Sequence, residues 1–311
     1  MESGFEHQPV LLDEVLDALS IREDGCYVDA TFGRGGHSRA ILERLNENGK
    51  VIALDQDPQA IAYGQQQFAQ EPRIEFEHCN FSQVKSVITA RHSKNDINGI
   101  LMDLGVSSPQ LDDAERGFSF LRDGPLDMRM NSSEGENAMQ WLARVELYDL
   151  TTVLKRFGEE RFARRIATAI IEKRQEKEIA TTAELAEIIS DAIPVKEKHK
   201  HPATRSFQAI RMHINNELQT IEQGLEGSAS VLAVGGRLVV ISFHSLEDRI
   251  VKRFMRNLSK GPELPAGLPV MTADIVQPYR LVGKPLISGE EELRKNPRAR
   301  SARLRVLERV H

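Results

Sequence analysis

Short apolar runs alternate with helix-like patterns through the first hundred residues of the chain. The apolar runs are typical of β-strands and cover residues 26–29, 51–55, 74–76 and 97–104. Stretches in which apolar residues recur with the period of a helix separate most of these runs. Strands that are spaced in this way need long crossover connections, so they pair side by side in the same direction. The pattern therefore predicts an α/β fold with a doubly wound, Rossmann-like parallel sheet.

The alternation stops after Asp103, and residues 136–227 carry only helical patterns. Helices are expected at residues 138–144, 147–157, 159–174 and 182–192. Thr181 and Glu184 have the spacing of a capping box, in which each side chain accepts a hydrogen bond from the other residue's backbone N–H. Apolar residues at steps of three and four over residues 207–225 predict one long helix with a single apolar stripe. This part of the chain is therefore expected to be all-helical.

Strand patterns return near the C-terminus. Residues 237–243 form an apolar run after a glycine pair, a helical pattern covers residues 246–257, and residues 303–306 alternate like an edge strand. The simplest architecture is a doubly wound domain that is interrupted by an inserted all-helical domain. The predicted boundaries divide the chain into residues 1–111, 112–215 and 216–311, of which the middle segment is the insertion.

The length and composition fit two compact domains of a globular protein. The chain has 311 residues, of which 40% are hydrophobic and 28% are charged. No apolar run approaches the roughly 20 residues of a membrane span, and acidic residues stand at the start, where a signal peptide carries positive charge. We therefore expect a cytoplasmic protein without membrane attachment. Cys26 and Cys79 are too few for a disulfide framework, so reduced thiols are expected.

The net charge of −5 and the pI near 6.0 argue against indiscriminate binding of nucleic acid. Basic residues nevertheless gather in two groups. The first contains Lys196, Lys198, Lys200, Arg205 and Arg211, and the second contains Arg294, Lys295, Arg298, Arg300, Arg303 and Arg305. Such runs are more often solvated faces than binding sites, but two of them in one acidic chain favour contacts with phosphates. His199 and His201 lie two residues apart without a nearby carboxylate cluster, so no metal site is predicted.

The strongest local signal for a ligand is a strand that runs into a glycine-rich turn and then into a helix, over residues 28–38. Glycines let the backbone approach a ligand closely, and the first turn of the helix offers unpaired N–H groups to a carboxylate or phosphate. A nucleotide-like cofactor is therefore expected. Ser38 stands where a dinucleotide-binding fingerprint that starts at Gly33 has its third glycine, which speaks against a nicotinamide cofactor.

Three further side chains are candidates for this cofactor site. Asp55 ends the second predicted strand, and its two carboxylate oxygens match the two hydroxyls of a ribose; the alternative is that it caps the next helix. Phe81 follows the third strand and is either a platform for an adenine ring or an ordinary core aromatic. His37 stands beside the glycines and is interpreted as a residue that lines the pocket, rather than as a catalytic base.

Asp103 ends the fourth predicted strand, and the loop over residues 103–110 follows it. The ligand crevice of an open parallel sheet lies beyond the carboxyl ends of the strands, so this loop is expected to face the reacting groups. Methyltransferases that act on amino groups commonly carry an Asn or Asp here, followed by two prolines and an aromatic residue. This chain keeps only the acidic residue of that pattern.

Six ordered segments together resemble the ribosomal RNA small subunit methyltransferase H family, of the MraW type. They cover residues 29–38, 103–110, 111–130, 201–207, 241–254 and 296–300. The resemblance implies transfer of a methyl group from S-adenosyl-L-methionine to N4 of a decoding-centre cytosine in 16S rRNA of the small ribosomal subunit. It also implies a Rossmann-like methyltransferase domain with a helical insertion for substrate recognition. The implied cofactor contacts are Gly35, Gly36, His37, Asp55, Phe81, Asp103 and Gln110.

Asp103 is the candidate catalytic residue for this reaction. Methylation at C5 of cytosine needs a cysteine thiolate, and neither cysteine suits that role, whereas an exocyclic amine attacks the methyl group without a covalent intermediate. Asp103 or the backbone carbonyls of residues 104–107 are expected to accept the N–H groups of the amine. The candidate RNA-binding residues are Arg205, Arg211, Arg298 and Arg300. The oligomeric state stays open between a monomer and a homodimer.

Two other classes of function compete with this interpretation. A non-catalytic ribosome-binding protein on a methyltransferase fold would not need the intact glycine turn and Asp55. A nicotinamide oxidoreductase is disfavoured by Ser38 and by the lack of an obvious site for hydride chemistry.

Overall fold

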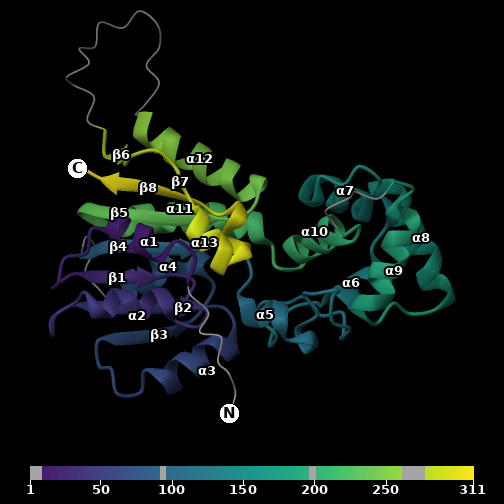
Figure 1. Ribbon diagram of the computed structural model, residues 1–311, viewed down its shortest axis with the longest axis horizontal. Coiled ribbons are helices and arrows are strands. Elements are labelled where there is room, and N and C mark those ends of the chain that lie inside the picture. Colours follow the sequence, from purple (N-terminus) through teal and green to yellow (C-terminus); the bar gives the residue numbers. More distant parts are fainter. Residues whose placement is uncertain (1–8, 92–95, 196–200, 261–276) are drawn as a thin grey trace, which may run out of the picture. The chain divides into compact units, whose positions relative to one another are not determined.

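The computed structural model describes residues 9–91, 96–195, 201–260 and 277–311, and Figure 1 shows the path of the chain. Contacts divide the chain into two compact units. The sheet unit consists of Met1–Gly105 and Leu218–His311, and the helical unit consists of Val106–Glu217. The helical unit thus begins before residue 112, because it includes the short helix α5 (Ser108–Asp112). A role of the inserted segment in substrate recognition stays a prediction.

The sheet unit is built on one sheet in the order β3-β2-β1-β4-β5-β8-β6, with β7 paired to β8. The strands are β1 (Cys26–Asp29), β2 (Lys50–Asp55), β3 (Ile74–His78), β4 (Ile97–Asp103), β5 (Leu232–Ser242), β6 (Tyr279–Leu281), β7 (Leu286–Ile287) and β8 (Arg303–Arg309). The first five run parallel, whereas β8 is antiparallel to its neighbours. The strand order reverses between β1 and β4, and doubly wound sheets bind ligands beyond the carboxyl ends of the strands at such a point. The predicted Rossmann-like α/β fold is confirmed.

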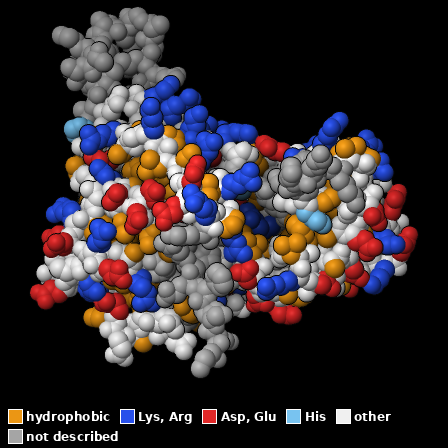
Figure 2. Space-filling model, viewed as in Figure 1, with side chains coloured by type: hydrophobic (Ala, Val, Ile, Leu, Met, Phe, Trp, Pro, Cys, Tyr) orange, Lys and Arg blue, Asp and Glu red, His pale blue; other side chains and the backbone are white. Residues whose placement is uncertain are grey.

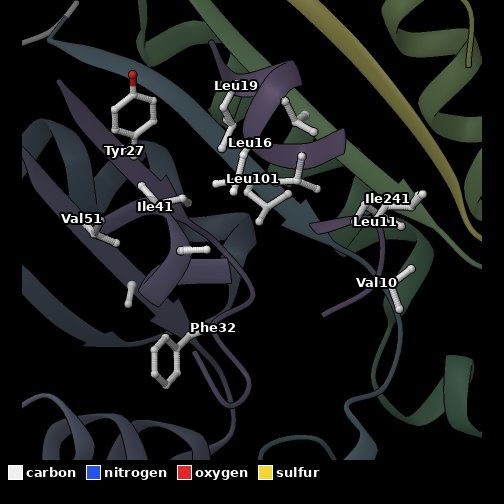
Figure 3. Packing of buried hydrophobic residues seen from close by; sticks show 14 of the residues in the cluster. Val10, Leu11, Leu16, Leu19, Tyr27, Phe32, Ile41, Val51, Leu101 and Ile241 are labelled. Carbon is white, nitrogen blue, oxygen red and sulfur yellow. The ribbon is translucent and has the colours of Figure 1, made fainter. Parts of the chain in front are cut away.

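Helices cover both faces of this sheet, and each face has its own hydrophobic core. The helices are α1 (Leu12–Leu19), α2 (Gly36–Glu43), α3 (Pro58–Gln67), α4 (Val84–Arg91), α11 (Glu217–Val231), α12 (Ser245–Lys260) and α13 (Glu290–Lys295). Successive residues of a strand point to opposite faces, so Val239 of β5 lies in one core and Val240 lies in the other. Figure 3 shows the first core, where Leu16 of α1 and Ile41 of α2 pack beside the sheet. Burial on both faces explains the continuous apolar runs of the strands.

The helical unit has a separate core. Besides α5 it contains α6 (Ala138–Arg144), α7 (Leu147–Gly158), α8 (Ala163–Glu176), α9 (Thr182–Ala192) and α10 (Thr204–Ile214), and its described residues include no strand. Leu150 of α7, Ile166 of α8 and Leu185 of α9 are fully buried together. The predicted capping box begins α9: the Glu184 N–H donates to Thr181 Oγ1 over 3.3 Å, and the Thr181 N–H donates to Glu184 Oε2 over 3.2 Å.

The single long helix expected over residues 207–225 is wrong, because the chain forms α10 and α11 with a break between them. Asn216 has a φ of +49°, which is outside the helical region. The side-chain amide of Asn215 donates to the carbonyls of Met128 and Arg211 over 2.7 and 2.9 Å, so it ties the end of α10 to its own unit. The apolar period continues across the break, but its first part packs in the helical unit and its second part in the sheet unit.

The edge position expected for residues 303–306 is also wrong. In the structure β8 lies inside the sheet, with β5 on one side and β6 and β7 on the other. Leu304 of β8 is fully buried and pairs directly with Leu286 of β7, which is 41% exposed. The sequence gives little sign of β6 and β7, because they are only three and two residues long and mostly exposed.

Replacing Leu304 and Leu286 by alanine in separate variants tests this position of β8. Leu304→Ala is expected to lower the free energy of unfolding by about 2–5 kcal/mol, because it leaves a cavity in the core. Leu286→Ala on the paired strand is the matched control and is expected to cost less than about 1 kcal/mol. Urea unfolding followed by circular dichroism measures both, and equal losses would contradict the inner position of β8.

Candidate functional site

Three aspartates end three neighbouring parallel strands of the sheet unit. Asp29 ends β1, Asp55 ends β2 and Asp103 ends β4. Because these strands are parallel neighbours, the three carboxyl groups lie at one edge of the sheet. Thr31 joins β1 to β4 at the switch point, since its Oγ1 accepts the Asp103 N–H over 2.7 Å. This edge is the candidate site.

The glycine-rich turn between β1 and α2 packs tightly at this edge. Gly35 has a φ of +73°, and a Cβ there would lie 2.5 Å from the ring of Phe32. A Cβ on Gly36, the first residue of α2, would lie 2.4 Å from Pro9. The Ser38 hydroxyl, which stands in place of a third glycine, donates to Asp29 Oδ2 over 2.6 Å. Only glycine fits the turn, and Ser38 fastens the start of α2 to the end of β1.

Asp55 holds the same turn from the neighbouring strand. Its Oδ2 accepts the Gly33 N–H over 2.7 Å, and its Oδ1 accepts the Asp57 N–H over 2.8 Å. The cap of α3 is Asp57, whose side chain accepts the Gln59 N–H, so the capping role considered for Asp55 belongs to its neighbour. Each oxygen of the Asp55 carboxylate keeps a second lone pair, which leaves acceptors for two hydroxyl groups of a ligand. Burial raises the pKa of Asp55 to about 6.

His37 is buried and held in one tautomer. Its Nε2 lies 3.1 Å from the carbonyl oxygen of Val10, and because a carbonyl only accepts, Nε2 carries the proton. Nδ1 therefore presents a lone pair, and it lies 3.9 Å from Asp103 Oδ2. Burial lowers the pKa of His37 to about 4, so the ring is neutral at physiological pH. The role of His37 as a residue that lines a cofactor pocket stays a prediction.

Asp103 is the most perturbed acid at this edge. Burial, together with the negative charges of Asp29 and Glu247, raises its pKa to about 8. Its Oδ1 has no hydrogen-bond partner among the residues that the structure describes. A quarter of the side-chain surface remains exposed, at 25%, although Oδ1 itself is buried. No described lysine or arginine forms an ion pair with Asp29, Asp55 or Asp103.

Residues 9–11 form a strap over the glycine turn, and α13 holds this strap. Leu11 has a φ of +55°, and its N–H donates to Glu292 Oε1 of α13 over 2.7 Å. Val10 and Leu11 are both buried beside Ile241, as Figure 3 shows. Glu292 thus positions the strap, and the strap carbonyl positions His37. No local pattern in the sequence indicates this arrangement, because Leu11 and Glu292 lie far apart in the chain.

The start of α12, which follows the end of β5, is capped in the same way by His244 and Glu247. The fully buried Glu247 accepts the N–H groups of Phe243 and His244 through Oε2 over 2.8 and 3.2 Å, and its Oε1 lies 3.0 Å from His244 Nε2. A Cβ on Gly105 would lie 3.9 Å from Glu247 Oε1, so this carboxylate borders the loop after β4. The spacing of His244 and Glu247 is the available sequence signal for this capping box, which was missed.

The two remaining candidate cofactor contacts lie in different units. Phe81 begins the 3-10 helix η1 (Phe81–Gln83) after β3, and its ring occupies the space that a Cβ on Gly224 would enter, at 2.5 Å. It packs against the second core, so the interpretation as a core aromatic has direct support. Gln110 belongs to α5 of the helical unit, where its side chain accepts the Ser107 N–H over 3.0 Å. The structure thus brings together Gly35, Gly36, His37, Asp55 and Asp103 in the sheet unit.

The arginines proposed for RNA binding differ in their surroundings. Arg211 forms two bonds of 2.7 and 2.8 Å with Glu217 and is only 14% exposed, so its charge is already balanced. Arg205 is half-buried on α10, whereas Arg298 and Arg300 are exposed on the 3-10 helix η4 (Pro297–Ser301). The other members of the first basic group and one of the paired histidines lie outside the described residues, at Lys196, Lys198, His199 and Lys200. Among the described helices, none combines the length and the apolar character of a membrane span.

Comparison with known proteins gives a family match over both units. The family model of the MraW methylase family matches residues 4–310. Among solved structures, the chain is similar to a proposed rRNA-methylase from Clostridium thermocellum, with a TM-score of 0.46 and 11% identity over 97% of each chain. It is also similar to an rRNA methylase from Streptococcus thermophilus, with a TM-score of 0.43 and 12% identity over 99% of this chain and 100% of that one.

Glu292→Ala tests whether the strap positions the site. Loss of a hydrogen bond to a charged acceptor is expected to weaken binding of S-adenosyl-L-methionine about 10-fold by calorimetry, because the strap whose Val10 carbonyl holds the His37 tautomer loses its anchor. Glu290→Ala on the same helix is the control, since this side chain is 93% exposed, and it should leave the affinity within about twofold. Glu292→Gln keeps an acceptor oxygen and should restore binding.

The ¹⁵N shifts of the His37 ring report its tautomer directly. A loss of affinity in Glu292→Ala without any change in these shifts would contradict the positioning role, because a general loss of stability would produce the same affinity change. Unchanged affinity would remove Glu292 from the site.

Proposed function

The chain belongs to the MraW methylase family and is an S-adenosylmethionine-dependent methyltransferase, and from this premise we propose that it methylates N4 of a decoding-centre cytosine in 16S rRNA of the small ribosomal subunit. The observation that carries the proposal is the acidic edge of the sheet, where Asp103 Oδ1 has no described hydrogen-bond partner and Asp103 Oδ2 lies 3.9 Å from Nδ1 of His37, the residue after the glycine turn. The family match and this edge together support a working catalytic site rather than a non-catalytic binding protein.

The residues at this edge fit the cofactor. S-adenosyl-L-methionine supplies a methyl group from a positively charged sulfonium centre. Asp55 offers acceptors for the ribose hydroxyls, and the tightly packed turn at Gly35 and Gly36 lies at the same edge. Asp29, Asp55 and Asp103 favour a cation, because no described basic side chain neutralises them. Dependence on this cofactor therefore follows from charge as well as from shape.

The state of the two cysteines supports an amine as the methyl acceptor. Methylation of a ring carbon of cytosine needs a thiolate that adds to the ring. Burial raises the pKa of Cys26 and of Cys79 to about 11, so both remain protonated thiols at physiological pH. Cys26 also begins β1 and so lies at the opposite edge of the sheet from Asp103. Neither cysteine can therefore supply the thiolate that methylation at C5 needs, whereas methylation of an amine needs no thiolate.

Asp103 is proposed to orient the amine and to accept its proton. A cation beside the carboxyl group lowers its pKa, so a group that is protonated in the free protein becomes a carboxylate in the complex. Its exposed part can then accept an N–H of the cytosine amine and direct the nitrogen lone pair toward the methyl group. When the N–C bond forms and the methyl–sulfur bond breaks, the extra proton of the amine passes to this carboxylate.

The proposed RNA substrate must present its base outside a helix. A paired cytosine has to flip out of its stack at a cost of a few kcal/mol, unless it is already single-stranded. We assign the helical unit to recognition of the surrounding RNA, and we propose Arg205 of this unit and Arg298 and Arg300 of the sheet unit as phosphate contacts. We propose that the protein works in the cytoplasm.

Transfer of labelled methyl to small ribosomal subunits from cells that lack the protein tests this function. Mass spectrometry of the product nucleosides is expected to show N4-methylcytidine. Asp103→Ala should lower turnover at least about 100-fold, because a general base contributes at least that much, while Asp24→Ala, an exposed aspartate, should change it by less than about twofold.

Three results would contradict the proposal. Label on a ring carbon would disprove N4 as the target. Absence of label on subunits, naked rRNA and other RNA would favour the non-catalytic alternative. Turnover of Asp103→Ala within a few fold of the unaltered protein would remove this residue from the catalytic list.

A further inference from the structure

Five basic side chains form one line along α12. Their positions repeat at steps of three, one, three and four residues, which places all of them on one face of a helix, and all five are exposed. They are Arg249, Lys252, Arg253, Arg256 and Lys260, and they are called the α12 stripe here. Figure 2 shows lysine and arginine side chains gathered over the part of the surface where Figure 1 places α12. The basic groups expected from the sequence did not include this helix.

The opposite face of α12 fixes the stripe to the sheet unit. Val251 and Met255 are buried in the second core, and Ile250, Phe254 and Leu258 pack against it. The stripe is therefore presented on a rigid helix. An apolar face that is used in the core is not available for insertion into a lipid bilayer, which is how amphipathic helices usually bind membranes.

The stripe keeps a high density of positive charge although the whole chain has a net charge of −5. The two acidic residues of α12 stand in its first turn: Glu247 is buried, and Asp248 binds Arg305 through two bonds of 2.7 and 3.1 Å. Arg253 pairs with Glu222 of α11 over 3.2 Å, but both side chains are more than half exposed, so this pair is weak. A local positive surface in an acidic protein favours an anionic partner at that place.

The stripe begins near the candidate site. α12 follows β5 directly, and β5 holds the loop after β4, since the carbonyl of Ile241 accepts the Leu104 N–H over 3.0 Å. From Arg249 to Lys260 the helix extends about 16 Å away from this edge, at about 1.5 Å per residue. A nucleic-acid strand carries regularly spaced phosphates. When one of its bases lies at Asp103, the neighbouring phosphates can therefore continue along the helix.

We propose that the α12 stripe binds the phosphate backbone of the RNA substrate next to the target base. This inference rests on the proposed function for its substrate, but it assigns a binding surface that neither the family match nor the sequence motifs identify. Lysine and arginine that contact phosphates supply affinity and orientation without reading the sequence. The stripe thus sets the direction in which the RNA leaves the site, and the acidic edge is left to recognise the cofactor and the base.

Charge reversal on the stripe tests the proposal. Lys252→Glu/Arg256→Glu is compared with Arg44→Glu/Lys50→Glu, which changes the net charge equally; Lys50 begins β2 at the opposite edge of the sheet, and Arg44 follows α2. Filter binding to total ribosomal RNA is measured over a series of salt concentrations. The stripe variant should bind at least about 10-fold more weakly, and its salt slope should be smaller by about 1.4, since each phosphate contact with a single strand contributes about 0.7.

The control variant should bind RNA within about twofold of the unaltered protein. Both variants should retain the affinity for S-adenosyl-L-methionine, which shows that the sheet unit is folded. If the glutamate variant does not fold, Lys252→Gln/Arg256→Gln removes the charges without reversing them, and it should give the same reduction of the salt slope.

The outcomes separate this inference from the proposed function. Equal RNA binding by the stripe and control variants would overturn the stripe assignment even if the unaltered protein methylates N4 of cytosine. Loss of binding to phosphatidylglycerol vesicles with intact RNA binding would overturn it as well, because the stripe would then serve a membrane surface. A failure of methyl transfer to the small subunit, together with weakened RNA binding of the stripe variant, would refute only the proposed function.

Discussion

Burial of three carboxyl groups at one edge of a parallel sheet is the constraint on which the site depends. Parallel strands end on the same side, so Asp29, Asp55 and Asp103 meet where the strand order reverses. Desolvation opposes their ionisation, and the negative charge of Asp29 adds to the raised pKa values of Asp55 and Asp103. The edge can lower this cost by holding protons or by accepting a cation. A positively charged methyl donor supplies such a cation, which explains why this arrangement suits the family's chemistry.

The surrounding structure serves to keep these groups close together and partly dry. Ser38 and Thr31 fasten the ends of β1 and β4, and the strap of residues 9–11 covers the glycine turn. Glu292 holds the strap from α13, and the strap carbonyl of Val10 fixes the tautomer of His37. The bond between Ser38 and Asp29 joins two side chains, and the other links join a backbone group to a side chain. All of them lie in buried or partly buried surroundings, where losing a partner is costly. The site is thus rigid on the side where the cofactor is expected.

The parts of the fold that depend on local patterns could be predicted from the sequence. The apolar runs of the parallel strands and the glycine turn are signals within a few residues, and both appear in the structure where they were expected. The break at Asn216 could not be predicted, because the apolar period continues through it. The inner position of β8 and the contact between Leu11 and Glu292 depend on segments far apart in the chain. Pairings of this kind leave no local pattern.

The candidate site could likewise be predicted from the sequence only where its residues follow a local pattern. Asp55 and Asp103 could be identified because each ends a predicted strand, whereas the partners that set their protonation come from other elements. Glu247 raises the pKa of Asp103 from α12, across the loop that contains Gly105. The sequence shows five basic residues on that helix, but only the buried opposite face shows that they point outward together.

The protonation state of Asp103 is the most direct measurement of the central claim. We expect ¹³C NMR of its carboxyl carbon, assigned with Asp103→Asn, to give a pKa of about 8 in the cofactor-free protein. The pKa should fall when S-adenosyl-L-methionine binds, and fall less with S-adenosylhomocysteine, which lacks the positive sulfur. A pKa near the ordinary aspartate value of about 4 in the cofactor-free protein, unchanged by either ligand, would contradict the dependence of the site on buried, crowded carboxyl groups.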